Sequence, residues 1–305
     1  MSLIPPNIEN ILKRQKYRLV GQHSAVKLCH WTKKSILNRG NCYKQQFYGI
    51  QSHRCLQMTP SVEWCTQRCV FCWRNIEHTL GCELEKYDDP ETIVEGAIEA
   101  QRVLLSGYGG VPELIDGEKF KQAQDPNQVA ISLSGEPTIY PEIGELIEIF
   151  NKRNFTTFLV TNGTLPERLR AMSDLPYQLY LSLDAPTKEL YRKIDNPIIE
   201  NGWEKINETL NLFPDLATRR AIRLTMIKGI NMVDPAGYAK LIEKAQPDFI
   251  EVKAYMFVGG SRQRLSLDNM PSFDEVMEFS ENLNKYLNYK IKDYKKDSRV
   301  VLLVK

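Results

Sequence analysis

The sequence contains no stretch of eighteen consecutive apolar residues, and its N-terminus lacks the basic and then apolar pattern of a secretory leader. A membrane span and export are therefore both unsupported, and we expect a cytoplasmic protein with no membrane partner. No low-complexity tract and no long linker interrupt the chain. With 305 residues, of which 42% are hydrophobic, it can bury a sizeable core in one large domain or two small ones.

Acidic residues are almost missing from the first 60 positions. This segment holds ten Lys or Arg against one acid, Glu9, for a net charge of +9, whereas the other 245 residues sum to −7. Aromatic residues are interleaved with the basic ones, as in Tyr17, Trp31 and Tyr43. Phosphate contacts combined with base stacking would need this composition, although a solvated helix face would also explain it.

Cysteine is absent after residue 82. All seven cysteines lie before residue 83, and an odd number in a chain of this size without a secretory leader argues against a disulfide framework. Metal ligation or reactive thiols in a reducing compartment are the remaining explanations.

From residue 88 onward, short apolar runs of strand length alternate with helical patterns. Six β/α cycles indicate a parallel sheet, and the fold class expected is α/β, either a partial, laterally open (β/α)6 barrel or an open doubly wound sheet. Polar residues at the carboxyl ends of the strands are then expected to form the ligand site. The strands are expected near 56–58, 129–133, 156–160, 178–183, 221–226 and 249–254, and the helices near 90–105, 141–152, 165–172, 202–212, 235–245 and 273–287.

Three segments are expected in the domain organisation. Residues 1–53 are expected to form a basic N-terminal helical cap, and residues 54–288 the (β/α)6 core. Residues 289–305 end in the apolar run 300–304 and are expected to form a C-terminal strand or tail.

The sharpest motif is the triplet Cys65-x3-Cys69-x2-Cys72, which directly follows the first expected strand. Three thiolates within eight residues can surround only one centre, and they are one ligand short of a closed structural site. With an aromatic Phe71 before the last cysteine, the triplet resembles the signature of the radical S-adenosylmethionine (SAM) superfamily. That resemblance implies a [4Fe-4S] cluster whose fourth iron chelates SAM. A zinc knuckle completed by a histidine such as His78 is the alternative.

Polar turns after the later strands extend the resemblance. The family places contacts to SAM at corresponding positions, which implies cofactor-binding roles here, although each turn taken alone is equally well explained as a turn or a cap. The positions are Gly135, Glu136, Pro137, Thr161, Asn162, Ser182 and Asp184.

A second set, Cys29, Cys42 and Cys55, recurs at intervals of thirteen residues among mostly polar or basic positions. A second cluster is the favoured interpretation. Zinc completed by a histidine is the alternative, with candidates His23, His30 and His53. Cys82 is left over and is interpreted as a core thiol.

Together the two cysteine sets, with Trp73-Arg74-Asn75 after the triplet, resemble the tRNA 4-demethylwyosine synthases over essentially the whole chain. The resemblance implies a radical-SAM barrel with two [4Fe-4S] clusters. It also implies condensation of N1-methylguanosine-37 of tRNA(Phe) with two carbons of pyruvate to form tricyclic 4-demethylwyosine. A flavodoxin-like donor domain has no room, so a monomer served by an external flavodoxin- or ferredoxin-like one-electron donor is expected.

The same resemblance suggests how substrates are held. Lys44, two residues after Cys42, is a candidate for a Schiff base with pyruvate, and a phosphate contact or a solvated charge is the alternative. Lys253 is a second candidate. Trp73 either stacks on a flipped base or fills the loop. Arginines expected to assist the cap in binding phosphates are Arg219, Arg220, Arg223, Arg262 and Arg264.

Two other functions remain open from the residues. One is a radical-SAM activase or maturase acting on a protein, although the C-x2-C-x2-C insert of ferredoxin type that such enzymes often carry is absent. The other is a non-catalytic Fe-S or zinc protein that binds RNA, which would not cleave SAM on reduction.

Overall fold

The computed structural model describes residues 2–305, and the chain divides into two compact units that are interleaved in sequence. Unit 1 comprises Met1–Trp64, Glu83–Val160 and Ala171–Tyr177. Unit 2 comprises Cys65–Cys82, Thr161–Arg170 and Gln178–Lys305. The expected segments 1–53, 54–288 and 289–305 therefore stay a prediction. No helix among residues 2–305 is long and apolar enough to cross a membrane.

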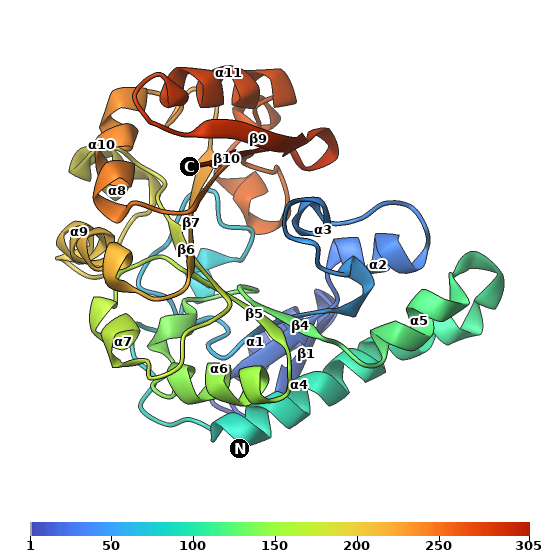
Figure 1. The fold of residues 1–305 in the computed structure, drawn as a ribbon. Coiled ribbons are helices and arrows are strands. Elements are labelled where there is room, and N and C mark those ends of the chain that lie inside the picture. The colour runs from blue at the N-terminus through green and yellow to red at the C-terminus, as the bar shows by residue number, and fades with distance from the viewer. Residues whose placement is uncertain (1) are drawn as a thin grey trace. The chain divides into compact units, whose positions relative to one another are not determined.

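Unit 1 is built on strands in the order β1-β2-β3-β4-β5. Its β1–β2 hairpin pairs antiparallel to β3, whereas β3, β4 and β5 are parallel. Helices α4 and α6 pack against each other (Figure 1). The elements are α1 (Pro6–Arg14), β1 (Tyr17–Val20), β2 (Ser24–Lys27), α2 (His30–Ile36), α3 (Tyr43–Tyr48), β3 (Cys55–Thr59), α4 (Pro90–Leu105), α5 (Gly117–Ala123), β4 (Gln128–Ile131), α6 (Ile143–Lys152) and β5 (Thr156–Thr161).

Unit 2 has the strand order β6-β7-β8-β10-β9. Strands β6, β7 and β8 are parallel, and a C-terminal hairpin extends the sheet because β10 runs antiparallel to both β8 and β9. Helix α11 packs along β8, β9 and β10 (Figure 1). The elements are α7 (Pro166–Ala171), β6 (Gln178–Ser182), α8 (Lys188–Ile194), α9 (Gly202–Leu212), β7 (Arg219–Met226), α10 (Pro235–Ala245), β8 (Phe249–Ala254), α11 (Phe273–Asn284), β9 (Lys290–Lys295) and β10 (Val300–Val304).

Local signals in the sequence explain where the predicted helices begin. Asp89 caps α4 by accepting a hydrogen bond from the Thr92 amide at 2.9 Å, with Pro90 in the first turn. Ser272 and Glu275 form the reciprocal capping box of α11. All six predicted parallel strands and their helices are present within two or three residues of the expected bounds.

The terminal segments differ from expectation. The predicted helical cap contains α1, α2 and α3 but also the β1–β2 hairpin, and the C-terminal segment forms two strands rather than one. Strands β1 and β2 have four residues each, too few for a clear alternation, and they are stabilised by pairing along the chain and with β3.

Candidate functional site

Cys29, Cys42 and Cys55 are gathered in unit 1 by three elements. Cys29 and Cys42 precede the short helices α2 and α3 with nearly identical backbone angles, φ −59° for both and ψ 140° and 145°. Cys55 is the first residue of β3. Burial raises the pKa of the Cys55 thiol, and the charges of Cys29 and Cys42 raise it further, so both of these thiols lie near Cys55. All three are partly buried and unoxidised.

Buried polar side chains fix the backbone of this cysteine set. The Cys42 amide donates to Ser52 Oγ at 2.8 Å, and Thr32 Oγ1 donates to the Ser52 carbonyl at 3.0 Å. Gln101 Nε2 on α4 donates to the Cys55 carbonyl at 3.1 Å. Sequence reasoning missed these three residues, because their contacts cross between segments far apart in the chain.

Lys44 on α3 is 8% exposed, and its Nζ lies 4.1 Å from the centroid of the Phe158 ring on β5. Its charge lowers the pKa of Cys55, which places the ammonium near that thiol. A phosphate contact is poorly served by an amine buried in this way. The other candidate, Lys253, donates from Nζ to the Ser298 carbonyl at 2.9 Å.

Two of the three histidines suggested as zinc ligands, His23 and His53, have other partners. His23 Nδ1 lies 2.6 Å from the Pro60 carbonyl, while its Nε2 accepts from the Asp88 amide at 2.9 Å. His53 Nε2 lies 2.6 Å from Gln122 Oε1. Within residues 2–305, no three His, Cys, Asp or Glu side chains surround one point as a single ion requires. A [4Fe-4S] cluster makes a different demand, since each thiolate binds its own iron.

The second cysteine set, Cys65, Cys69 and Cys72, lies on a loop of unit 2 that follows β3 in the chain. Its backbone is tied to the end of α8, since the Val70 amide donates to the Ile194 carbonyl at 2.8 Å. The Cys72 amide donates to the Cys69 carbonyl at 3.0 Å. Cys82, expected to be a core thiol, is only partly buried and contacts the Cys65 carbonyl at 3.6 Å.

The segment after β8 closes over this loop. Arg264 Nε donates to the Val70 carbonyl at 3.0 Å, and its Nη2 donates to the carbonyl of Cys72. The Gly260 amide donates to the Trp73 carbonyl at 2.8 Å. Gly259 adopts φ +60°, and a Cβ there would lie 2.2 Å from the Trp73 carbonyl oxygen. The close backbone approach therefore requires glycine.

Three of the arginines expected to bind phosphates have acceptors within the protein, and their phosphate-binding role stays a prediction. Arg264 donates to the Val70 carbonyl in the cysteine loop, and Arg220 donates to the Pro214 carbonyl at 2.9 Å. Arg223 forms a 3.0 Å ion pair with Glu251, whose side chain is fully buried. These guanidiniums satisfy internal acceptors that sequence patterns do not reveal.

Asn162 connects the end of β5 to the cysteine loop within unit 2. Its Nδ2 donates to Thr66 Oγ1 at 2.9 Å and lies 4.0 Å from Cys65 Sγ. Its Oδ1 accepts from Thr164 Oγ1 at 2.7 Å. Thr161 Oγ1 accepts from the Gly163 amide at 3.1 Å. The Thr-Asn-Gly turn thus orients the first cysteine of the triplet.

Ser182 and Asp184 line a small internal cavity with Gln67, Tyr191 and Asp195. Burial raises the pKa of Asp184 to about 6, although its Oδ1 accepts from the Thr225 amide at 2.9 Å. Burial also raises the pKa of Asp195 well above its usual range. Asp195 Oδ1 is buried without a hydrogen-bond partner among the described residues, as a polar ligand's contact would be.

The Gly135-Glu136-Pro137 turn follows β4 in unit 1. Gly135 has φ +71°, and a Cβ there would lie 2.0 Å from the Ser61 carbonyl oxygen. The Glu136 amide donates to the Trp64 carbonyl at 2.8 Å, and the Glu136 carboxylate caps the next turn at Thr138. Ser134 Oγ beside this turn is buried with no partner in the described chain. The turn packs on the residues that precede Cys65.

Comparison with known proteins defines the class. The radical SAM superfamily model matches residues 59–242, and the wyosine base formation model matches residues 244–305. A solved radical SAM methyltransferase from Sphaerobacter thermophilus is 14% identical with a TM-score of 0.55, covering 93% of this chain and 80% of its own, which supports the fold alone. With the predicted α/β radical-SAM fold confirmed, the protein is a radical SAM enzyme.

Closer relatives define the family. The S-adenosyl-L-methionine-dependent tRNA 4-demethylwyosine synthase of Pyrococcus abyssi is 55% identical over 99% of this chain and 90% of its own. The synthase of Methanocaldococcus jannaschii is 44% identical over 99% and 96%. A structure described as TYW1 with a lysine-pyruvate adduct bound is 42% identical, with a TM-score of 0.90 over 99% of this chain and 96% of its own. The chain belongs to the tRNA 4-demethylwyosine synthase family, whose members are enzymes of wyosine formation.

Proposed function

We propose that this enzyme condenses N1-methylguanosine-37 of tRNA(Phe) with two carbons of pyruvate to form tricyclic 4-demethylwyosine. The observation that carries the proposal is the buried Lys44 amine on α3, the helix that Cys42 precedes, near enough to Cys55 for its charge to lower the pKa of that thiol. Family membership supports it, as does the lysine-pyruvate adduct named for the similar TYW1 structure.

Cys65, Cys69 and Cys72 would hold the [4Fe-4S] cluster expected of a radical SAM enzyme, and their donor set fits it with one iron left for SAM. The bound cluster would supply the electron that cleaves SAM to a 5′-deoxyadenosyl radical. The proposed role of the surrounding turns is to hold SAM itself. We propose that SAM is contacted by residues 135–137, 161–162, 182 and 184. Ser134 Oγ and Asp195 Oδ1, which lie beside these residues, are buried without a hydrogen-bond partner in the described chain, as expected of atoms that contact a polar ligand.

Cys29, Cys42 and Cys55 are proposed to hold a second [4Fe-4S] cluster with an open iron. Three partly buried thiols, two of them near enough to Cys55 to raise its pKa, fit that group, and Ser52 and Gln101 bind the backbone of Cys42 and Cys55. When bound, the cluster would supply a Lewis-acidic corner for the carboxylate and keto oxygens of pyruvate.

Lys44 is proposed to attack the keto carbon of pyruvate. The amine nitrogen forms a C=N bond, the keto oxygen leaves as water, and Lys44 gives up its two amine protons in the process. The reaction needs the neutral amine, because only its lone pair can attack the keto carbon. The external electron donor and the monomeric state are part of the proposal, and the cytoplasmic location stays a prediction.

Borohydride trapping tests the proposal. The reconstituted enzyme with pyruvate should become irreversibly modified on reduction, with the added mass on the peptide that carries Lys44. Lys44→Arg should abolish trapping. Lys253→Arg, which alters the lysine bonded to Ser298, is the matched control and should trap fully. Modification that survives in Lys44→Arg would exclude Lys44 as the pyruvate-binding amine.

A further inference from the structure

The edge strand of unit 2 carries a row of lysines. β9 pairs with β10 alone, so its other edge is free of strand partners among the described residues. Lys290, Lys292 and Lys296 are exposed. Lys292 has no counterpart in the β9–β10 register and is the bulged residue of the strand. None of these three lysines forms an ion pair with a carboxylate within the described chain.

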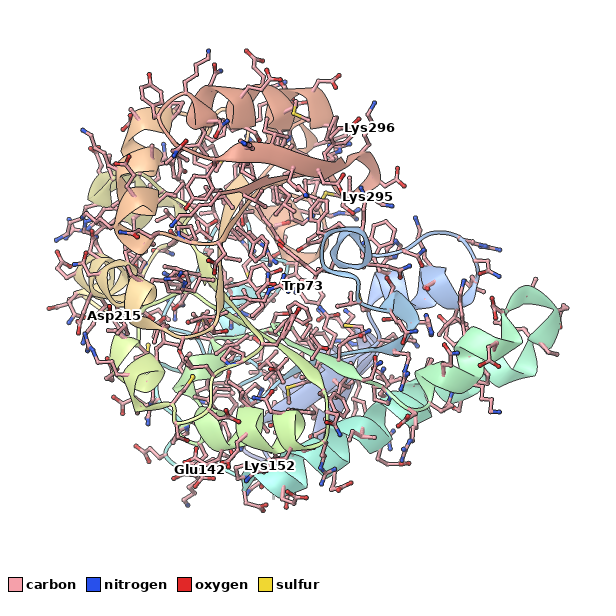
Figure 2. The ribbon with its side chains drawn as sticks, viewed as in Figure 1. Trp73, Glu142, Lys152, Asp215, Lys295 and Lys296 are labelled. Atoms are coloured by element: carbon pink, nitrogen blue, oxygen red, sulfur yellow. The ribbon has the colours of Figure 1, made fainter. Side chains whose placement is uncertain are left out.

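The row of lysines on β9 runs toward the carboxyl end of the parallel strand β8. β9 is antiparallel to β10, which is antiparallel to β8, so β9 and β8 run the same way. Val300 is paired with Lys253 on one side and Lys295 on the other. By this register Lys295 and Lys296 lie level with the carboxyl end of β8; both are labelled in Figure 2. Ligands of parallel α/β folds bind at that end.

Aromatic rings accompany the lysines. Tyr294 is 45% exposed and contacts the Phe273 ring, with centroids 5.2 Å apart. Lys296 Nζ lies 5.7 Å from the same Phe273 ring. Tyr286, before the strand, is 55% exposed. Exposed rings among cations are typical of surfaces that bind nucleic-acid strands.

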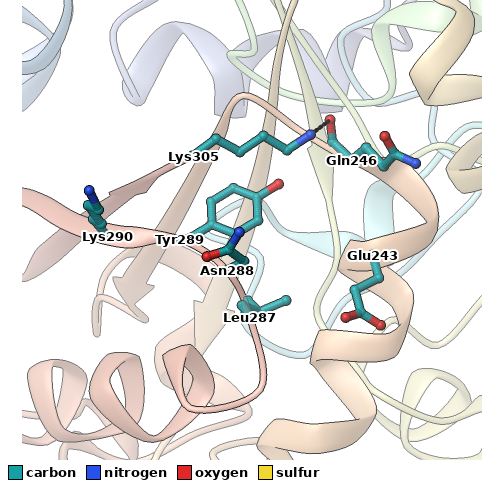
Figure 3. A pocket seen from close by; sticks show the side chains of 7 residues that line it. All are labelled: Glu243, Gln246, Leu287, Asn288, Tyr289, Lys290 and Lys305. Carbon is teal, nitrogen blue, oxygen red and sulfur yellow. Dashed lines mark hydrogen bonds between the residues drawn. The ribbon is translucent and has the colours of Figure 1, made fainter.

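A hollow of about 630 Å³ continues the surface at the other end of β9 (Figure 3). Lys290 and Lys305 line it, and the Lys305 amine reaches the Gln246 carbonyl at 3.5 Å. Tyr289 also lines it, and the Tyr289 hydroxyl donates to the Pro247 carbonyl at 2.6 Å. The basic surface thus extends from this hollow to the turn after β9.

We propose that this surface, named the β9 surface and formed by Lys290, Lys292, Tyr294 and Lys296, binds the phosphate backbone of the substrate tRNA. Residues 285–296 hold five lysines against one acid, Asp293, in a chain whose net charge is only +2. A polyanion gains affinity from each phosphate neutralised there. The proposal rests on the proposed function, since it names the surface by which that substrate is held.

Lysines on an edge strand also prevent pairing with other sheets, and the experiment must separate the two roles. Lys292→Glu/Lys296→Glu keeps the edge charged, so it preserves protection against edge pairing, but it repels phosphate. Lys193→Glu/Lys240→Glu, on the exposed faces of α8 and α10, makes the same change in net charge and is the matched control.

Binding of a tRNA(Phe) transcript is measured by fluorescence anisotropy at salt concentrations from about 50 mM to about 200 mM. The β9 variant should bind about tenfold or more weakly at the lowest salt, and the slope of log K against log salt should become shallower by about 1.4 or more. SAM cleavage without tRNA should equal wild type in both variants.

Equal affinity in the β9 variant and wild type, or equal weakening in both variants, would overturn the proposal. If wild-type enzyme fails to bind the transcript, the proposed function fails together with this surface. If wild type binds and the β9 variant binds equally, only the surface is wrong.

Discussion

Arg264 and Cys72 are joined through the backbone, because the Arg264 guanidinium donates to the Cys72 carbonyl. The same side chain donates to the Val70 and Arg74 carbonyls, at 3.0 and 3.4 Å. Arg264 lies in the part of the chain matched by the wyosine base formation model, whereas the cysteine loop lies in the radical SAM match. The family-specific C-terminal region thus fixes the shape of the proposed cluster loop.

Removal of this guanidinium should loosen the loop. Hydrogen bonds to a charged donor contribute about 1.5–3 kcal/mol each, so Arg264→Ala should lower iron retention at the first cluster and alter the electron paramagnetic resonance signal of its reduced state. Arg264→Lys should restore part of both. Arg262→Ala is the control, since Arg262 is exposed and donates only to Phe257 at 3.3 Å. Unchanged iron content and spectrum in Arg264→Ala would refute the role.

Gly135→Ala should be strongly destabilising. Its φ of +71° is unfavourable for alanine, and the added Cβ would meet the Ser61 and Trp64 carbonyl oxygens at 2.0 and 2.5 Å. Strain and overpacking each cost about 1–3 kcal/mol, so the melting temperature should fall by several degrees and SAM binding should weaken. Gly117→Ala, where an added Cβ meets nothing within 4 Å, should leave both unchanged. A fully stable Gly135→Ala would contradict this geometry.

His23 should make stability depend on pH. Burial lowers the pKa of His23, outweighing its hydrogen bond to Pro60 and the charge of Asp88. The unfolded chain therefore binds a proton that the folded chain does not, so the stabilisation is complete above about pH 7 and is lost as the pH falls below about 6.5. Between about pH 8 and about pH 5, the melting temperature should fall more steeply with decreasing pH for wild type than for His23→Gln.

His30 and His53 also have pKa values lowered mainly by burial. They therefore change the pH dependence of stability in the same direction as His23. Only the difference between wild type and His23→Gln is therefore assigned to His23. If the melting temperatures of the two proteins change in parallel with pH, His23 titrates alike in the folded and unfolded states.

Iron stoichiometry separates one cluster from two. Anaerobic reconstitution with iron and sulfide should give about eight irons per chain, and about four in a Cys29→Ala/Cys42→Ala/Cys55→Ala variant. Cys82→Ala is the matched control and should retain about eight. About four irons in wild type would remove the proposed role of the N-terminal cysteines.

Much of the architecture could be predicted because parallel strands leave strong apolar runs between capped helices. The strand 249–254 and the helix 235–245 match their predicted bounds. The hairpin strands could not be predicted in the same way, because β1 and β2 are too short and β9 reads Lys-Ile-Lys-Asp-Tyr-Lys, with one apolar side chain among its three partly buried positions.

Spacing alone suggests which residues form the candidate site, but it does not reveal the contacts that support them. Cysteine intervals predict which thiols belong together, since chain proximity limits their separation. Nothing local marks Ser52 as the acceptor for Cys42, or Arg264 as the clamp on Cys72, because those contacts form only when distant segments pack. The internal acceptors of Arg220, Arg223 and Arg264 were missed for the same reason, since a guanidinium looks the same in sequence whether its acceptor is a phosphate or a carbonyl.

The most direct test of the central claim follows both SAM cleavage and the modified nucleoside in one reaction. Reconstituted enzyme, reductant, SAM, ¹³C-labelled pyruvate and tRNA bearing N1-methylguanosine should yield labelled 4-demethylwyosine, detected by mass spectrometry. Cys69→Ala should lose SAM cleavage and product together. Cys29→Ala should still cleave SAM yet form no tricyclic base, and full product formation by Cys29→Ala would contradict the account.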